Sequence, residues 1–102
     1  MIHVIATIEL EPGLRNQFLS AFHELVPLVH AEKGCIEYGP TVDVETGLGP
    51  QLPLREDVVT VVEKWETIED LKAHLAAPHM DDYRQKVHEI VKGMQIQVLK
   101  PA

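Results

Sequence analysis

The chain has 102 residues, of which 45% are hydrophobic and 25% are charged, and its formal net charge at pH 7 is -7. This length suits one domain with one hydrophobic core, spanning residues 1–102. The acidic balance argues against nucleic acid and against an anionic membrane surface, because both attract basic patches. No apolar run approaches the roughly 20 residues that a membrane helix needs. We therefore expect no nucleic-acid partner and no membrane partner.

The N-terminus and the cysteine count bear on the compartment. The first residues carry no basic segment ahead of their apolar residues, so we expect no signal peptide. Cys35 is the only cysteine, which excludes an internal disulfide and is typical of a reducing compartment. These two observations favour a cytoplasmic protein.

Residues 2–10 are rich in Ile and Val with partial alternation, which predicts a strand. Pro12 and Gly13 then precede a helix whose apolar stripe repeats every three to four residues: Leu14, Phe18, Phe22, Leu25 and Val29. Pro27 lies inside this helix and predicts a kink or break, because proline removes a backbone hydrogen bond. We expect Gly34 to end the helix as a left-handed cap.

Two further strands are predicted in the middle of the chain. Residues 35–45 form the first, and residues 57–66 alternate so regularly that they form the clearest strand in the sequence. Valines occur on both faces of the later strand, so we expect both faces to be buried for much of its length. Residues 46–56 contain two glycines and two prolines, which predicts a long loop, and its leucines indicate that it packs on another surface.

The last third of the chain predicts two helices and a strand. Thr67 and Asp70 have the spacing of a capping box, with Asp in place of the usual Glu or Gln. Pro78 separates the first helix from a second one, which we expect to run to about residue 92 and to be capped by Gly93. Residues 94–100 alternate and predict the closing strand.

The predicted order is strand, helix, strand, strand, helix, strand. This order indicates an α+β, ferredoxin-like βαββαβ fold with a four-stranded antiparallel sheet. Right-handed crossovers place the helices on one face, so the other face would be bare. Since a bare apolar sheet face of several hundred Å² is uncommon in a soluble monomer, we expect a second copy to cover it in a homodimer.

One segment, residues 63–83, gathers side chains that suit a flat ligand and a proton transfer. It holds the only tryptophan, Trp65, together with His74, His79, Glu63 and Tyr83. Histidine is a general base near neutral pH, and a helix N-terminus favours neutral His79 by lowering its pKa. Each residue also has a plain structural interpretation, as a packed histidine, a junction residue, a core indole or a solvated strand carboxylate. Spacing of the His-Glu-x-x-His type is absent, so we expect no metal site.

Four motifs give the chain a family resemblance. They are the opening strand with Pro12-Gly13, Glu32-Lys33-Gly34-Cys35 leading to Tyr38, Glu63-Lys64-Trp65, and His74-Leu75-Ala76-Ala77-Pro78-His79. In this order and spacing the chain resembles the antibiotic biosynthesis monooxygenase family of dimeric α+β-barrel proteins. The loop at 46–56 and the last strand bring it nearer the small bacterial quinol monooxygenases of the YgiN type.

The resemblance implies a reaction of a quinol, or a related polycyclic phenol, with O₂ and without a metal or flavin cofactor. A deprotonated hydroquinone can itself pass an electron to O₂, so the protein needs a base and a dry pocket. His74 or His79 would be the base, Glu63 would orient it, and Trp65 would hold the ring. Thr7 and Tyr83 join Trp65 as expected substrate-binding residues. Haem-degrading relatives carry Asn, Trp and a haem-ligating His at positions that match Thr7, His74 and about Arg84, so the resemblance does not favour haem degradation.

Two other functions remain open at this stage. Another relative with a similar His-x-x-x-Pro-His segment isomerises a small phosphorylated ketone, although few basic residues lie in residues 63–83 to bind a phosphate. A dimeric module that binds small aromatics without turnover would use the same residue types. Oxygen consumption separates the monooxygenase from both.

Overall fold

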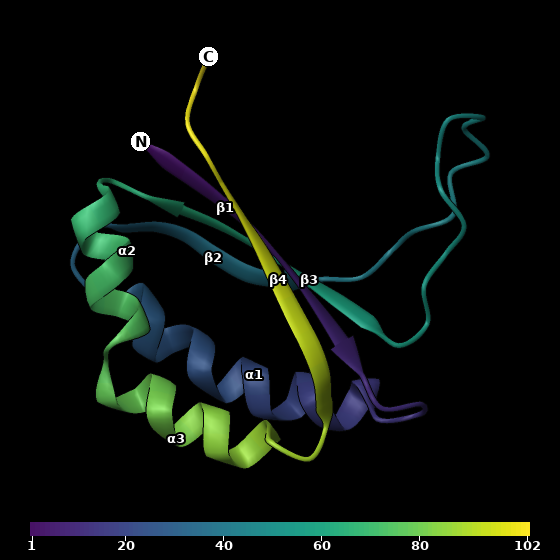
Figure 1. Ribbon diagram of the computed structural model, residues 1–102, viewed down its shortest axis with the longest axis horizontal. Helices are drawn as coiled ribbons and strands as arrows, with labels where there is room; N and C mark the ends of the chain where they lie inside the picture. The colour runs from purple at the N-terminus through teal and green to yellow at the C-terminus, as the bar shows by residue number, and fades with distance from the viewer.

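The computed structural model describes residues 1–102 and contains four strands and three helices. The elements follow the chain as β1 (Ile2–Leu10), α1 (Arg15–His30), β2 (Cys35–Thr41), β3 (Val58–Trp65), α2 (Ile68–Leu75), α3 (Pro78–Val87) and β4 (Val91–Leu99). The strands pair antiparallel in the order β2-β3-β1-β4, and the helices lie together on one face of the sheet (Figure 1). This confirms the predicted ferredoxin-like fold. No helix is both long enough and apolar enough to cross a membrane.

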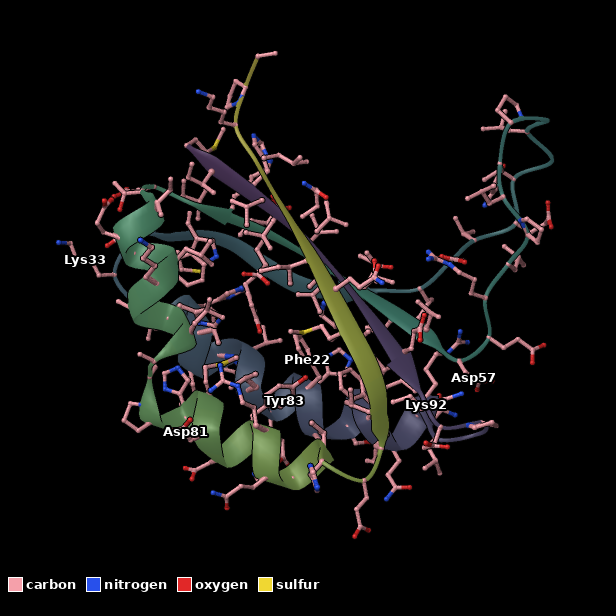
Figure 2. All side chains as sticks on the ribbon, in the orientation of Figure 1. Phe22, Lys33, Asp57, Asp81, Tyr83 and Lys92 are labelled. Atoms are coloured by element: carbon pink, nitrogen blue, oxygen red, sulfur yellow. The ribbon has the colours of Figure 1, made fainter.

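The core lies between the helices and one face of the sheet. Alternation buries every second residue of β1 and β3, while the apolar stripe of α1 faces them. Phe22 of α1 and Tyr83 of α3 point toward each other in this layer (Figure 2), with ring centroids 5.6 Å apart in an edge-on arrangement. The stack of rings thus joins both long helices beneath the sheet.

Helix α2 begins as the sequence predicts. The Asp70 N–H donates to the Thr67 hydroxyl oxygen at 3.1 Å, which satisfies one of the free donors of the first turn. Pro78 occupies the first turn of α3, where its missing N–H costs nothing. The break between α2 and α3 therefore lies just before Pro78, as predicted.

Two predicted boundaries are wrong, and the predicted break of the first helix at Pro27 does not occur. Helix α1 is continuous through Pro27, because its stripe packs on the sheet both before and after that residue. It ends at His30, so Gly34 is left-handed (φ +81°) as expected but lies in the turn after the helix rather than at its cap. Helix α3 ends at Val87, and Gly93 pairs with Glu9 within β4, because backbone pairing with β1 takes over from the helix.

The segment between β2 and β3 is longer than predicted and lacks pairing. Strand β2 ends at Thr41, and residues 42–57 protrude as a loop away from the helices (Figure 1). The Arg55 guanidinium donates to both carboxylate oxygens of Asp43, which closes the base of the loop. Its apolar residues Leu48 and Leu52 are exposed, so the packing expected of this loop does not occur within the chain.

The face of the sheet opposite the helices is less apolar than predicted. Val58 and Val62 of β3 are only half-buried there. A row of polar side chains crosses all four strands at this face, formed by Thr41, Thr60, Thr7 and Gln95 in register. Within one chain, therefore, only the face of β3 toward the helices is fully buried.

Candidate active site

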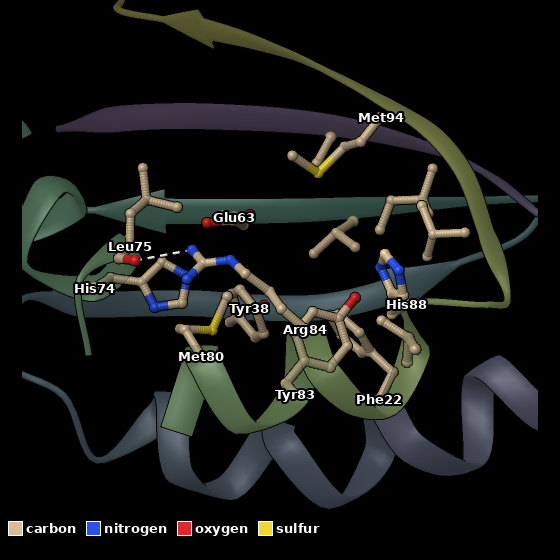
Figure 3. A pocket seen from close by; sticks show the side chains of 15 residues that line it. Phe22, Tyr38, Glu63, His74, Leu75, Met80, Tyr83, Arg84, His88 and Met94 are labelled. Carbon is tan, nitrogen blue, oxygen red and sulfur yellow. Dashed lines mark hydrogen bonds between the residues drawn. The ribbon is translucent and has the colours of Figure 1, made fainter. Parts of the chain in front are cut away.

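A cavity of about 300 Å³ lies between the sheet and helices α2 and α3. Eleven of its fifteen lining residues are hydrophobic, and the other four are Glu63, His74, Arg84 and His88. Figure 3 shows these side chains around one space, with Glu63 on the sheet side and Arg84 reaching across from α3. An apolar wall with a few polar groups is the usual make-up of a small-molecule site.

His74 is the best-positioned base in this cavity. Helix α2 presents it toward the core, where it is 1% exposed, and its Nδ1 lies 2.9 Å from Glu32 Oε2. Because a carboxylate can only accept, Nδ1 carries the proton and donates it to Glu32. In the neutral ring Nε2 is then unprotonated and is the nitrogen that can accept a proton.

Burial lowers the pKa of His74, and this effect outweighs the opposing influence of the hydrogen bond to Glu32. The His74 imidazole is therefore neutral at pH 7. A neutral imidazole with one nitrogen fixed by a carboxylate is the arrangement of a general base.

Glu32 is the residue that sequence reasoning missed. It lies in the turn between α1 and β2, and Oε2 also accepts a hydrogen bond from His79 Nε2 at 2.8 Å. One carboxylate thus joins the two predicted histidines. The residue stands in the Glu32-Lys33-Gly34-Cys35 motif, but 42 residues separate it from His74 and no local spacing indicates the contact.

Glu63 does not orient a histidine, contrary to the prediction. Its Oε1 accepts a hydrogen bond from Trp65 Nε1 at 2.9 Å, and its side chain lines the cavity while the residue is 7% exposed. Burial raises the pKa of Glu63 to about 7, the Trp65 hydrogen bond partly opposes this, and the negative charge of Glu32 adds to it. No cation pairs with this carboxylate.

Trp65 and Thr7 do not line the cavity. Trp65 is completely buried behind it, and its ring lies 4.7 Å from the His74 ring. Thr7 lies on the opposite face of the sheet, because it pairs with Thr60 and Gln95 in the polar row. The sequence placed both residues near the ligand, but a strand alternation assigns Thr7 to the other face.

Tyr83 lines the cavity, and His79 does not. The sequence singled out Tyr83 only weakly, and Tyr38 joins it in the cavity wall from β2. Burial raises the pKa of both phenols, so each hydroxyl remains protonated and available as a donor at neutral pH. His79 is partly exposed on the far side of Glu32, where it supports the carboxylate.

Arg84 of α3 and His88, the C-cap residue just after α3, complete the wall. The guanidinium donates to the Leu75 carbonyl at 2.8 Å, drawn as the dashed line in Figure 3, and to Asp81 at 3.0 Å. Arg84 thereby ties the end of α2 to α3 across the cavity. These two bonds orient the guanidinium and leave its remaining N–H donors for a ligand.

Comparison with solved structures defines the class of fold. The chain superimposes on a Methanosarcina mazei protein with a TM-score of 0.82 and 22% identity, covering 99% of this chain and 92% of that one. A Pseudomonas aeruginosa protein gives a TM-score of 0.80 at 21% identity, covering 99% and 93%. At these identities the likeness establishes the shared fold.

Sequence comparison establishes the family. Residues 1–86 match the family described as "Antibiotic biosynthesis monooxygenase". The chain is also 40% identical over 103 residues to "Probable quinol monooxygenase YgiN" of Escherichia coli strain K12, covering 99% of this chain and 98% of that protein. This chain belongs to the antibiotic biosynthesis monooxygenase family, and its activity class is that of a monooxygenase, an oxidoreductase.

Proposed function

We propose that this protein oxidises a quinol, or a related polycyclic phenol, with O₂ and without a bound cofactor. The single observation that carries the proposal is the hydrogen bond from His74 to Glu32 at the wall of an apolar cavity. The name of the Escherichia coli relative supports the choice of a quinol as the substrate class. Cofactor independence follows from the chemistry of the substrate, because an electron-rich phenolate can reduce O₂ directly.

The cavity suits a flat aromatic ring. Its volume of about 300 Å³ lies at the lower end of the range for small-molecule sites. The rings of Phe22 and Tyr38 stack with centroids 5.5 Å apart, and Tyr83 meets Phe22 edge-on, so the helix side of the cavity is aromatic. A ring bound there is shielded from water, which strengthens its interactions with His74.

The reaction begins with a proton transfer. His74 Nε2 takes a phenolic proton, and Glu32 stabilises the imidazolium that forms. The phenolate then gives electrons to O₂, and one oxygen atom bonds to a neighbouring ring carbon. Overall, a quinol with one ring C–H and one O₂ give a hydroxyquinone and one water, so the substrate loses four electrons and O₂ gains four.

Oxygen uptake tests this function directly. Purified protein, freed of metal and flavin, is mixed with a chemically reduced naphthoquinol, and uptake is compared with a protein-free control. The expected result is uptake well above autoxidation and a fall of about 10²–10⁴-fold in His74→Ala. His23→Ala, which changes an exposed histidine of α1, is the matched control and should retain full activity.

Uptake no faster than autoxidation, with any quinol tried, would overturn the proposal. The isomerase alternative would then gain support if a phosphorylated ketone were converted without O₂, since Arg84 places a cationic group at the cavity. Binding of a naphthoquinone without turnover would instead favour a binding module.

We also propose a homodimer in the cytoplasm. Half-buried Ile5 and Val62 lie side by side on the uncovered face of the sheet. Covering them with a second copy removes apolar surface from water. Sedimentation at micromolar concentration should give twice the mass of the chain, and a monomer at that concentration would contradict the proposal. The free thiol of Cys35 is compatible with a reducing compartment.

A further inference from the structure

Glu63 is a buried carboxylate whose function the first proton transfer leaves unexplained. It faces the cavity and accepts a single hydrogen bond, from Trp65 Nε1 to Oε1, so Oε2 has no protein donor. No Lys, Arg or His forms an ion pair with it. An unpaired buried carboxylate is costly to the fold, and a neutral carboxyl group at that position costs far less.

The surroundings of Glu63 favour its protonated form over its ionised form. Around it stand apolar Ala6 and Ile8 of β1 and Met94 of β4, and the charged or titratable groups near it or lining the same cavity are Glu32, Cys35, Tyr38, His74, Tyr83, Arg84 and His88. Of these, Glu32 adds negative charge, and the ion pair of Arg84 is with Asp81 rather than with Glu63. Nothing in the cavity therefore holds Glu63 in its ionised form except the Trp65 hydrogen bond.

We propose that Glu63, in its protonated form, is the proton donor to the departing oxygen atom, acting across the cavity from the base His74. This inference rests on the proposed function and assigns a second catalytic residue to the same site. When the environments of two titratable groups shift their pKa values in opposite directions, one group can act as the acid and the other as the base. Burial lowers the pKa of His74, so that its imidazole accepts a proton, and raises the pKa of Glu63 to about 7, so that its carboxyl group can carry a proton to give.

The proton and electron balance shows why a donor is needed. Once oxygen has bonded to the ring carbon and His74 has returned its proton, the intermediate is a hydroperoxide on a carbon that still carries hydrogen. The O–O bond then breaks, Glu63 gives its proton to the distal OH, and water leaves. His74 takes the ring C–H proton as the C=O bond forms, and that proton afterwards restores Glu63. Without a donor, hydroxide would have to leave inside an apolar cavity.

The decisive variant is Glu63→Gln, which keeps an oxygen to accept the Trp65 hydrogen bond but cannot donate an acidic proton. We expect a fall in kcat of about 10²-fold and loss of the rate decrease near pH 7 that ionisation of Glu63 causes in the wild type. Part of the O₂ consumed should now appear as H₂O₂ and unhydroxylated quinone, which balances as one quinol plus one O₂. Glu37→Gln, an exposed strand residue paired with Lys64, is the matched control.

The fluorescence of Trp65, the only tryptophan, reports the same group without any turnover. Because the indole N–H contacts Glu63, a titration near pH 7 should appear in the wild type and in His74→Gln and vanish in Glu63→Gln. If the wild type is active and Glu63→Gln is equally active, or has the same pH profile as the wild type, the donor role of Glu63 is overturned while the proposed function stands. A wild type that consumes no O₂ overturns the proposed function itself.

Discussion

The indole of Trp65 contacts both groups that we assign to proton transfer. Its ring lies 4.7 Å from the ring of His74, and its N–H donates to Glu63 at 2.9 Å. We expected from the sequence that Trp65 would contact the ligand. Because its side chain is completely buried, it instead positions Glu63 and His74. A single side chain thus fixes the separation of two catalytic groups that come from a strand and a helix.

Replacing Trp65 with Phe should therefore alter the pH profile in a defined direction. Phe keeps a ring against His74 but removes the hydrogen bond that lowers the pKa of Glu63. The pKa of Glu63 should rise, and the alkaline fall in kcat should move to higher pH. Oxygen uptake measured from pH 5 to pH 9 tests this, and an alkaline limb that stays in place or moves to lower pH would show that Trp65 does not control Glu63.

Replacing Glu32 with Gln should move both limbs of the pH profile to lower pH. The negative charge of Glu32 raises the pKa of His74 and also that of Glu63, so its removal lowers both. We also expect kcat to fall by about 10-fold or more, because a Gln oxygen stabilises the imidazolium less well. A purely structural role for Glu32 would lower activity without moving the limbs. His79→Ala, which keeps the Glu32 charge, should shift neither limb to lower pH.

Glu63 also makes the stability of the protein depend on pH. Its pKa is raised from 4.5 to about 7 in the folded state, so stability is fully present below pH 4.5 and is lost as the pH rises through about 7. The shift corresponds to about 3 kcal/mol of unfolding free energy. Glu63→Gln removes this loss. The unfolding free energy of Glu63→Gln relative to that of the wild type, measured by urea denaturation at fixed protein concentration, should therefore rise by about 2–3 kcal/mol between pH 4.5 and pH 8. If the difference in unfolding free energy between the two proteins were the same at both pH values, the raised pKa of Glu63 would be contradicted.

Local patterns in the sequence were sufficient for the fold but for only part of the site. Alternation and the three-to-four spacing of apolar residues located all seven elements, and the Thr67 cap and Pro78 fixed the start of α2 and α3. The histidines were visible because they stand on a short segment. The contact of Glu32 with His74 was not visible, because a turn after α1 meets α2 only once the sheet has formed.

The boundaries that were missed have a related cause. Gly93 resembled a helix cap, but its neighbours gain more by pairing with β1 than by extending α3. The position of Thr7 in the polar row, away from the cavity, depends on which face of the sheet the helices cover. Sequence alternation separates two faces of a strand, but it does not say which one carries the site.

The turn that carries Glu32 depends on Gly34. This glycine has φ +81°, and the carboxylate of Asp70 on α2 lies where a Cβ would be. The close approach brings the turn against the helix that holds His74. Gly34 therefore helps to place Glu32 within hydrogen-bond distance of His74. Gly34→Ala should lower the unfolding free energy by more than about 2 kcal/mol, since the left-handed conformation alone costs an L-residue about 1–2 kcal/mol.

Gly13 provides the control that separates the two contributions. It has nearly the same φ, +80°, but no atom lies within 4 Å of its would-be Cβ, so Gly13→Ala measures the backbone cost alone. Gly34→Ala should lower the unfolding free energy by more than Gly13→Ala does. Adding Asp70→Ala to Gly34→Ala should recover only part of the difference, because the Asp70 Cβ also crowds the site. Oxygen uptake should fall in Gly34→Ala and stay normal in Gly13→Ala. Equal losses of stability in the two variants would mean that the turn and α2 do not depend on this close approach.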